Sequence, residues 1–260
     1  MTIVRGLSGG PGLIEARELD FGEICRCRDW SAGRSGQSGR LPGYGGFAGQ
    51  CHDQDMKPAE ADESRLISDE EVQRFHLDKV TPHNGPIVLA EYDPRWPELF
   101  AREAARIRAA LGTRAVLVEH AGSTSVPGMA AKPIIDIVLA VPDSADEPAY
   151  VPALEAAGYV LRVREPGWFE HRMFKGLDTD VNLHVFSAGA GEIDRMLLFR
   201  DWLRADAPDR DGYLRVKRDL AMRTWRHVQH YADAKTAIVE QIIARAASHE
   251  PAPSPGLPPD

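Results

Sequence analysis

The sequence has few cysteines, no long apolar run and no excess of positive charge, and each shortage excludes a class of protein. Its 3 cysteines, Cys25, Cys27 and Cys51, all precede Met56, so the rest of the chain has neither a disulfide framework nor a thiolate catalyst. No stretch approaches the length of a membrane span, and the N-terminus lacks the basic, then apolar layout of a signal peptide. We therefore expect a cytoplasmic protein with no membrane partner.

The overall charge excludes a further class of partner. With a formal net charge of -8, the chain is not expected to bind nucleic acid nonspecifically or to adhere to an anionic membrane, although a local basic site is compatible with it. A hydrophobic content of 43% in 260 residues is ordinary for a globular protein with a real core. The sequence does not specify the oligomeric state.

The two ends of the chain differ in composition from its middle. Residues 1–55 are rich in Gly, Ser and Arg without any period, and we predict that they are disordered. Gly9-Gly10-Pro11-Gly12 in this stretch lacks the lysine of a phosphate-binding loop. Because the composition changes at Met56, our hypothesis is that translation starts there. Residues 56–85 read as a polar lead-in with a helix capped by Ser68, and 248–260 as a disordered tail.

The segment from 86 to 247 carries a regular alternation of strands and helices, which predicts an α+β domain followed by packed helices. In order, the pattern predicts a short strand at 87–89, an amphipathic helix ending at Gly112, a first central strand at 115–120 and a second strand at 134–141. A helix at 148–157, strands at 159–163, 172–174 and 180–186, and helices around 193–203, 213–225 and 237–243 follow.

One carboxylate, Asp136, interrupts the apolar run 134–141. Such a run is typical of a strand covered on both faces, where a lone carboxylate is costly unless a cation, hydrogen-bond donors or a metal offset it. Asp136 is therefore expected at the accessible end of its strand, facing Lys132 or a divalent cation. Capping of a neighbouring helix, or a pair with an arginine, explains the same residue equally well.

A second polar set lies on the strand predicted at 180–186. Asp180, Asn182 and His184 alternate with apolar residues and so share one face. If this strand lies beside the Asp136 strand, its polar face opens onto the same cleft.

Several motifs in order resemble the GrpB family, over roughly residues 87–247. They are His120-x-Gly122-Ser123-Thr124-Ser125-Val126-Pro127-Gly128, Ala131-Lys132-Pro133-Ile134-Ile135-Asp136, Asn182-Leu183-His184-Val185, Phe199-Arg200-Asp201-Trp202-Leu203-Arg204 and Tyr231-Ala232-x-Ala234-Lys235. The resemblance implies a nucleotidyltransferase-like mixed β-sheet with packed helices and a C-terminal helical segment. Similar domains are fused to a dephospho-coenzyme A kinase in some relatives.

The wider superfamily holds nucleotide phosphates on a Gly-Ser turn and metal ions on an Asp-x-Asp strand and a third carboxylate. The resemblance therefore implies phosphate binding at the turn and assigns the first carboxylate to Asp136. The turn residues concerned are Gly122, Ser123, Thr124 and Ser125. The second carboxylate position is Val138, which cannot bind a hard cation.

A metal site is still expected in a reduced form. The predicted ligands of a divalent ion, Mg²⁺ or Mn²⁺, are Asp136, Asp180 and His184, and a single-metal site that also uses His120 or Glu119 is an alternative. The histidines also fit the role of satisfied polar groups at strand ends.

The basic residues suit a ligand that bears phosphate. We expect Lys132, Arg172 and Lys217 to face the cleft and Arg204 to be solvated. Lys217 lies one helical turn from Tyr213, and Lys235 one turn from Tyr231, so each pair can present a ring and an ammonium together. Packing of both tyrosines in the helical core is the commoner outcome.

The leading functional hypothesis is a nucleotidyltransferase-type protein that binds a nucleotide or another phosphorylated small molecule. Ser123 and its backbone amides would hold the phosphates, Asp136 the metal, and Lys132 or Arg172 would neutralise developing charge. A catalytically degenerate binding or accessory module of the same fold is the alternative that Val138 favours. A hydrolase with a histidine–carboxylate metal centre is a third.

Overall fold

The structure, a computed structural model, describes residues 66–249. The predictions for residues 1–55 and for the tail beyond 249 lie outside the described residues. Within 66–249, none of the helices combines the length and the apolar character that a membrane crossing requires.

A mixed five-stranded sheet forms the centre of the domain and confirms the α+β class. Its spatial order is β1-β2-β5-β4-β3, in which β2 and β5 run parallel and every other neighbouring pair is antiparallel. The strands are β1 Leu117–Ala121, β2 Ile135–Val141, β3 Tyr159–Glu165, β4 His171–Gly176 and β5 Val181–Ser187. The apolar run around Asp136 is an interior strand buried along its whole length, as predicted.

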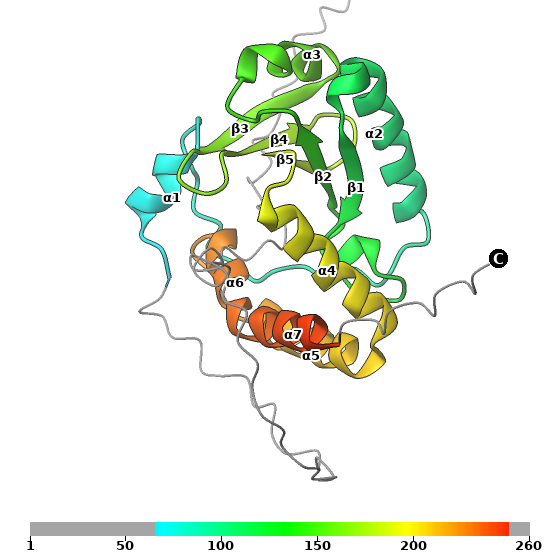
Figure 1. Ribbon diagram of the computed structural model, residues 1–260. Helices are drawn as coiled ribbons and strands as arrows, with labels where there is room; N and C mark the ends of the chain where they lie inside the picture. Colours follow the sequence, from blue (N-terminus) through cyan, green and yellow to red (C-terminus); the bar gives the residue numbers. More distant parts are fainter. Residues whose placement is uncertain (1–65, 250–260) are drawn as a thin grey trace, which may run out of the picture.

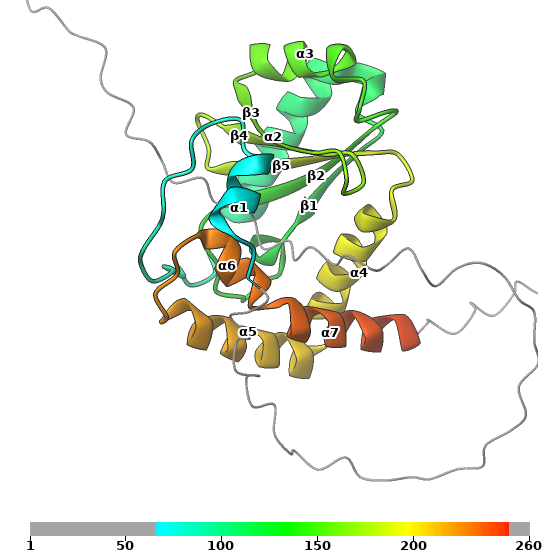
Figure 2. The ribbon, with the colours of Figure 1, turned by 90° about the vertical axis from the view of Figure 1, so that its left-hand side faces the viewer.

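Helices flank both faces of this sheet (Figures 1 and 2). They are α1 Asp69–Phe75, α2 Trp96–Leu111, α3 Val151–Ala156, α4 Gly191–Ala205, α5 Ala207–Ala221, α6 Val228–Asp233 and α7 Thr236–Ser248, with 3₁₀ turns at Gly112–Arg114, Ser123–Ser125 and Glu147–Ala149. Ser68 caps α1 by accepting a bond from the Glu71 amide, and Gly112 ends α2, both as predicted.

The two faces of the sheet have different partners. On one face, alternate residues of β2 such as Ile137 and Leu139 pack with Leu183 of β5 against α2 and α3. Figure 2 shows these two helices on one side of the sheet and α4, α5, α6 and α7 on the other. The core under α2 is therefore apolar, and the residues of opposite parity, Asp136 among them, point to the other side.

The second face is apolar only at its two ends. At one end Ile193 of α4 packs on Val138 and Phe186, and at the other Phe75 of α1 packs on Met173. Between these ends lie polar residues of β2, β4 and β5. The strand register places Asn182 beside both Asp136 and Lys175, and it places His184 beside Val138. The sheet therefore brings the two predicted polar strands together.

Two predictions about strands were wrong. Residues 87–89 form no strand: only isolated bridges occur there, joining Gly85 to Trp225 and Ala90 to Ala131, because this segment crosses towards the helices rather than along a sheet edge. β1, predicted as a central strand, lies at the edge of the sheet and pairs with β2 alone.

Asp209 joins three helices of the C-terminal segment. Its carboxylate accepts two bonds from Arg245 of α7, at 2.9 and 2.6 Å, and one from the Trp202 indole of α4, at 2.6 Å. Although burial raises the pKa of Asp209, these bonds outweigh it and hold the pKa below its usual range.

Asp209→Asn is expected to lower the free energy of unfolding by about 1–2 kcal/mol at neutral pH, because the bonds with Arg245 are charge-assisted. A carboxyl whose pKa is lower in the folded state stabilises that state at pH values above its unfolded pKa. The stabilisation is lost as the pH falls through the pKa of the folded state. The difference from wild type should therefore shrink below about pH 4. Urea unfolding across this range measures it; Asp211→Asn, on an exposed residue of the same helix, is the control. A constant difference at all pH values would contradict the assignment.

Candidate functional site

The turn that follows β1 is pressed against Asp136. The pairing of β1 with β2 places Ala121 opposite Asp136, and Gly122 follows with φ 64° and ψ -175°. A Cβ built on Gly122 would lie 2.3 Å from Asp136 Oδ2. Both the positive φ and the missing side chain of Gly122 are thus required for this contact. The Gly-Ser turn thus lies directly against Asp136.

The three hydroxyls of the turn are buried and bonded within the chain. Ser123 Oγ accepts a bond from Lys217 Nζ at 2.7 Å, Thr124 Oγ1 donates to the Ile134 carbonyl at 3.2 Å, and Ser125 Oγ donates to the Gly122 carbonyl at 2.5 Å. The Lys217 ammonium also donates to the Ala130 carbonyl at 3.0 Å. A phosphate held by this turn must therefore replace or add to an internal contact.

Asp136 was expected at the accessible end of its strand, and this was wrong: its side chain is sealed from solvent, and its carboxylate faces an amide and an imidazole of β5. Asn182 Nδ2 donates to Oδ1 at 2.9 Å, and His184 Nε2 lies 3.6 Å from the same oxygen. Burial raises the pKa of Asp136, but His184, Asn182 and the charge of Lys132 outweigh it and keep the pKa below its usual range. Asp136 is therefore an anion whose contacts are an amide and an imidazole.

His184 belongs to a longer buried chain. His184 Nδ1 lies 3.0 Å from His171 Nε2, and His171 Nδ1 lies 2.7 Å from Glu165 Oε2. His171 and Glu165 were missed in the sequence. The signal that could have found His171 is the alternation of His171, Met173 and Lys175 along β4, which puts the three on the face of His184.

Three buried lysines come from three segments, and one of them, Lys217, bonds the turn directly. Lys217 of α5 is fully buried beside Tyr213, with the ammonium 5.5 Å from the ring centroid. Lys235, at the start of α7, and Lys132, before β2, approach one ring, that of Tyr231, at 4.5 and 5.7 Å. The ring and ammonium pairs predicted one helical turn apart are thus both present, and both tyrosines are also buried in the core.

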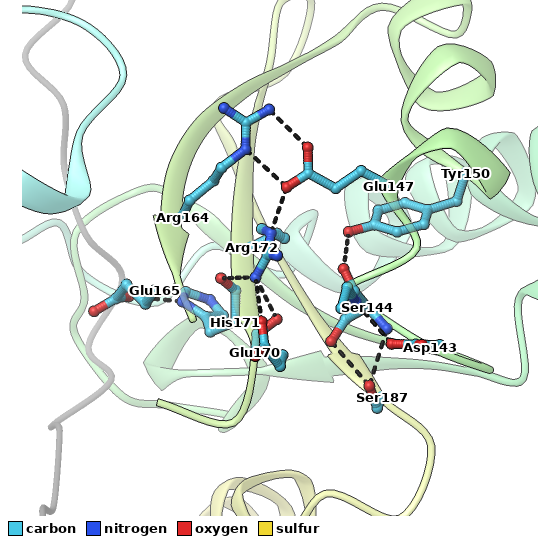
Figure 3. Close-up of polar contacts among 11 residues, drawn as sticks. Asp143, Ser144, Glu147, Tyr150, Arg164, Glu165, Glu170, His171, Arg172 and Ser187 are labelled. Atoms are coloured by element: carbon cyan, nitrogen blue, oxygen red, sulfur yellow. Dashed lines mark hydrogen bonds and ion pairs between the residues drawn. The ribbon is translucent and has the colours of Figure 1, made fainter. Parts of the chain in front are cut away.

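Arg172 lies on the opposite face of the sheet from Asp136. It is paired across β4 and β5 with Val185, a residue of the core under α2. Figure 3 shows its guanidinium and that of Arg164 on the Glu147 carboxylate, where Arg164, with Arg172, keeps the pKa of Glu147 below its usual range. Arg172 therefore does not line the Asp136 site, because the two-residue period of β4 turns it away.

Asp180 is near the site but separated from Asp136. It precedes β5 and is partly exposed, and its carboxylate contacts Lys175 Nζ at 3.0 Å. The same ammonium donates to Asn182 Oδ1 at 2.8 Å, and Asn182 in turn donates to Asp136. A lysine and an amide thus stand between the two carboxylates.

The two other candidate ligands have partners elsewhere. His120 faces α2, stacked on Phe100 at 4.8 Å and hydrogen-bonded to Thr124, and burial lowers its pKa to about 4. Glu119 accepts a bond from Arg200 of α4 at 2.8 Å. Neither side chain joins His184 and Asp136.

Arg204 is exposed, as predicted, with 39% of its side chain accessible, and its guanidinium also bonds the turn. Its Nε and Nη2 donate to the Ser125 carbonyl at 3.1 and 3.0 Å, while Arg200 on the preceding turn of α4 donates to the His120 carbonyl at 2.9 Å. The two arginines therefore anchor α4 to the ends of the Gly-Ser turn.

The donor set does not fit the two-metal arrangement that the fold implies. Val138 at the second carboxylate position is buried in the apolar cluster under α4. Within residues 66–249 no three His, Cys, Asp or Glu side chains gather closely enough to hold a metal ion. Asp136 and His184 remain a pair of one oxygen and one nitrogen donor, and the predicted set with Asp180 stays a prediction.

Comparison with known proteins identifies the family. The family model described as GrpB protein matches residues 86–245. A UPF0157 protein of Halalkalibacterium halodurans is 66% identical over 179 residues, 69% of this chain and 92% of the relative, and one of Streptomyces coelicolor is 51% identical over 64% of this chain and 88% of its own length. The crystal structure of GrpB from Enterococcus faecalis is similar with a TM-score of 0.55 at 32% identity, over 62% of this chain and 98% of that one. The chain belongs to the GrpB family.

Proposed function

We propose that this protein binds a nucleotide or another phosphorylated small molecule at the Gly122–Ser125 turn, beside Asp136. This is the nucleotidyltransferase-type hypothesis of the sequence analysis, in which Asp136 holds a divalent cation that accompanies the phosphates. The proposal does not specify which molecule accepts a transferred group.

The observation that carries the proposal is the concentration of buried positive charge at the turn. Burying an ammonium group is costly, and the fold nevertheless buries Lys217, which bonds Ser123, and Lys132, whose charge acts on Asp136, with at most 7% exposure each. They come from two different segments, so the tertiary structure, rather than local sequence, gathers them. A phosphate group, with its multiple anionic oxygens, is the ligand chemistry that such a cluster suits.

Binding requires the site to open. Asp136, Ser123 and Lys217 are each at most 3% exposed. A cavity of about 400 Å³ lies elsewhere, lined by α1 residues, Val80, Pro82 and His227. A phosphate that enters at the turn is expected to replace the contact between Lys217 and Ser123, so that the ammonium neutralises ligand charge instead of bonding the hydroxyl.

Val138 supports a second candidate, a binding or accessory module that does not catalyse transfer. Two metal ions stabilise both the attacking and the leaving oxygens of an in-line displacement, and they need several anionic ligands. A buried valine in place of the second carboxylate removes one of them. Phosphate recognition by Lys132 and Lys217 does not depend on that carboxylate.

Thermal unfolding of the full-length protein tests the binding proposal. Nucleoside triphosphates with Mg²⁺ or Mn²⁺ are expected to raise the melting temperature by several degrees, and Asp136→Asn should abolish the rise. Asn is nearly isosteric with Asp, so the fold should persist. Asp180→Asn is the matched control, because Asp180 is partly exposed on the far side of Lys175, and should retain the rise.

Two outcomes decide between the candidates. Absence of a shift with every triphosphate, sugar phosphate and inorganic triphosphate tried would contradict the binding proposal. If a compound binds, release of pyrophosphate in the presence of candidate acceptors indicates transferase activity. Binding that survives chelation of metal, without turnover, indicates the accessory module.

A further inference from the structure

Asn182 of β5 connects Asp136 to a buried lysine on the next strand. The strand register puts Asp136 of β2 on one side of Asn182 and Lys175 of β4 on the other. Asn182 Nδ2 donates to Asp136 Oδ1 at 2.9 Å, and Asn182 Oδ1 accepts a bond from Lys175 Nζ at 2.8 Å. Because Asn182 is completely buried, both ends of its amide depend on these neighbouring strands.

Lys175 fixes which end of the amide faces Asp136. An amide has a donor end and an acceptor end, and a half-turn about the last side-chain bond exchanges them. An ammonium group can only donate, so Lys175 holds the amide oxygen on its own side and leaves the NH₂ group for Asp136. The charge of Lys175 also polarises the amide, which strengthens the bond that Asn182 donates.

That bond determines how the Asp136 carboxylate is turned. Oδ1 accepts the bond from Asn182 and lies 3.6 Å from His184 Nε2, so both contacts with β5 fall on one oxygen. Oδ2 is the oxygen beside the Gly-Ser turn, where a Cβ built on Gly122 would lie 2.3 Å from it. The two oxygens therefore differ in role: Oδ1 is anchored to the sheet, and Oδ2 is directed at the turn.

We propose that Lys175 and Asn182 are positioning residues, which hold Asp136 Oδ1 so that Oδ2 is the oxygen presented to a ligand at the Gly122–Ser125 turn. The ligand part of this inference rests on the proposed function, in which Asp136 holds the cation that accompanies the phosphates. A carboxylate that is already fixed loses little freedom when the cation binds, so the anchor raises affinity. Asp180 also accepts a bond from Lys175, at 3.0 Å, and Asp180→Asn retains an oxygen for that bond.

The anchor is testable without any ligand, because Asn84 and Asn182 are the only asparagines in the sequence. Selective ¹⁵N-asparagine labelling of the full-length protein therefore gives side-chain amide signals from these two residues alone. Asn84 is exposed, so the side-chain amide protons of Asn182 should exchange with water roughly 100-fold more slowly, or slower still. Equal exchange at the two residues would overturn the proposal, and this measurement needs no variant.

Lys175→Met removes the donor and keeps most of the side-chain length. The bond between Asn182 and Asp136 should weaken, so the Asn182 amide signal should move and its exchange with water should become about 10-fold faster. Arg172→Met is the matched control, because it also removes a buried positive charge from β4, but on the other face of the sheet. It should leave the Asn182 signal unchanged. An unchanged Asn182 signal in folded Lys175→Met protein overturns the proposal.

Inorganic triphosphate with Mn²⁺ is the probe for the ligand part. Lys175→Met should weaken its binding about 10-fold, and Arg172→Met should not change it. Equal losses in the two variants would indicate a purely structural role and overturn the proposal, as would an affinity that Lys175→Met leaves unchanged. If wild type binds no phosphorylated compound but its Asn182 signal responds to Lys175→Met, the anchor on Oδ1 is upheld and the proposed function fails instead.

Discussion

Replacement of Gly122 by alanine should lower the free energy of unfolding by about 3 kcal/mol or more and abolish the stabilisation by nucleotides that we propose. Two separate causes act at this residue. Its backbone, at φ 64° and ψ -175°, occupies a region that only glycine adopts readily, and an added Cβ would lie 2.3 Å from Asp136 Oδ2. Relief of that clash requires the carboxylate to leave Asn182, or the turn to leave β2.

Gly128→Ala separates the two causes. Gly128 also has a positive φ, 78°, but a Cβ there would meet nothing within 4 Å, so only backbone strain of about 1 kcal/mol is expected. Urea denaturation of both variants measures the difference in their free energies of unfolding. Thermal unfolding with and without nucleotide measures the loss of the proposed binding. If Gly122→Ala is no less stable than Gly128→Ala and still binds ligand, then close contact between the turn and Asp136 is not required.

The apolar patterns of the chain were sufficient to predict most of the fold. Interior burial of 135–141 and the capped helix after Ser68 both follow from local period and cap residues, and both are present. Two errors have separate causes. Residues 87–89 are apolar enough for a strand, but only tertiary structure decides whether they reach a sheet edge. The pattern predicts no helix at α6, because its six residues are too few to show a helical period.

The site was predictable where strand parity alone decides. Asn182 and His184 share the face of Asp136 because β5 pairs with β2 in register, which the alternation on β5 anticipated. The same rule places Arg172 on the other face of the sheet, contrary to the prediction, because the adjacent His171 is the residue of β4 that contacts His184. Charge alone could not separate the two, because both neighbours are basic and buried.

Lys217→Met is expected to lower the free energy of unfolding by about 3 kcal/mol, because it removes the donor that two buried acceptors share. The ammonium bonds Ser123 Oγ at 2.7 Å and the Ala130 carbonyl at 3.0 Å, and so ties α5 to both ends of the segment that leads from the turn to β2. Methionine keeps the packing volume beside Tyr213, so the loss reports the polar contacts rather than a cavity.

A double-mutant cycle with Ser123→Ala isolates the contact between α5 and the turn. The coupling energy between the two substitutions is expected to be about 1 kcal/mol or more, because the residues share a buried bond. Arg218→Met, which breaks only the exposed pair with Glu91 on the same helix, should cost at most about 0.5 kcal/mol and show no coupling to Ser123. If Lys217 and Ser123 behave additively, their bond does not hold the turn. The lysine would then act on the turn only through the Ala130 carbonyl, and a phosphate could reach Ser123 without displacing it.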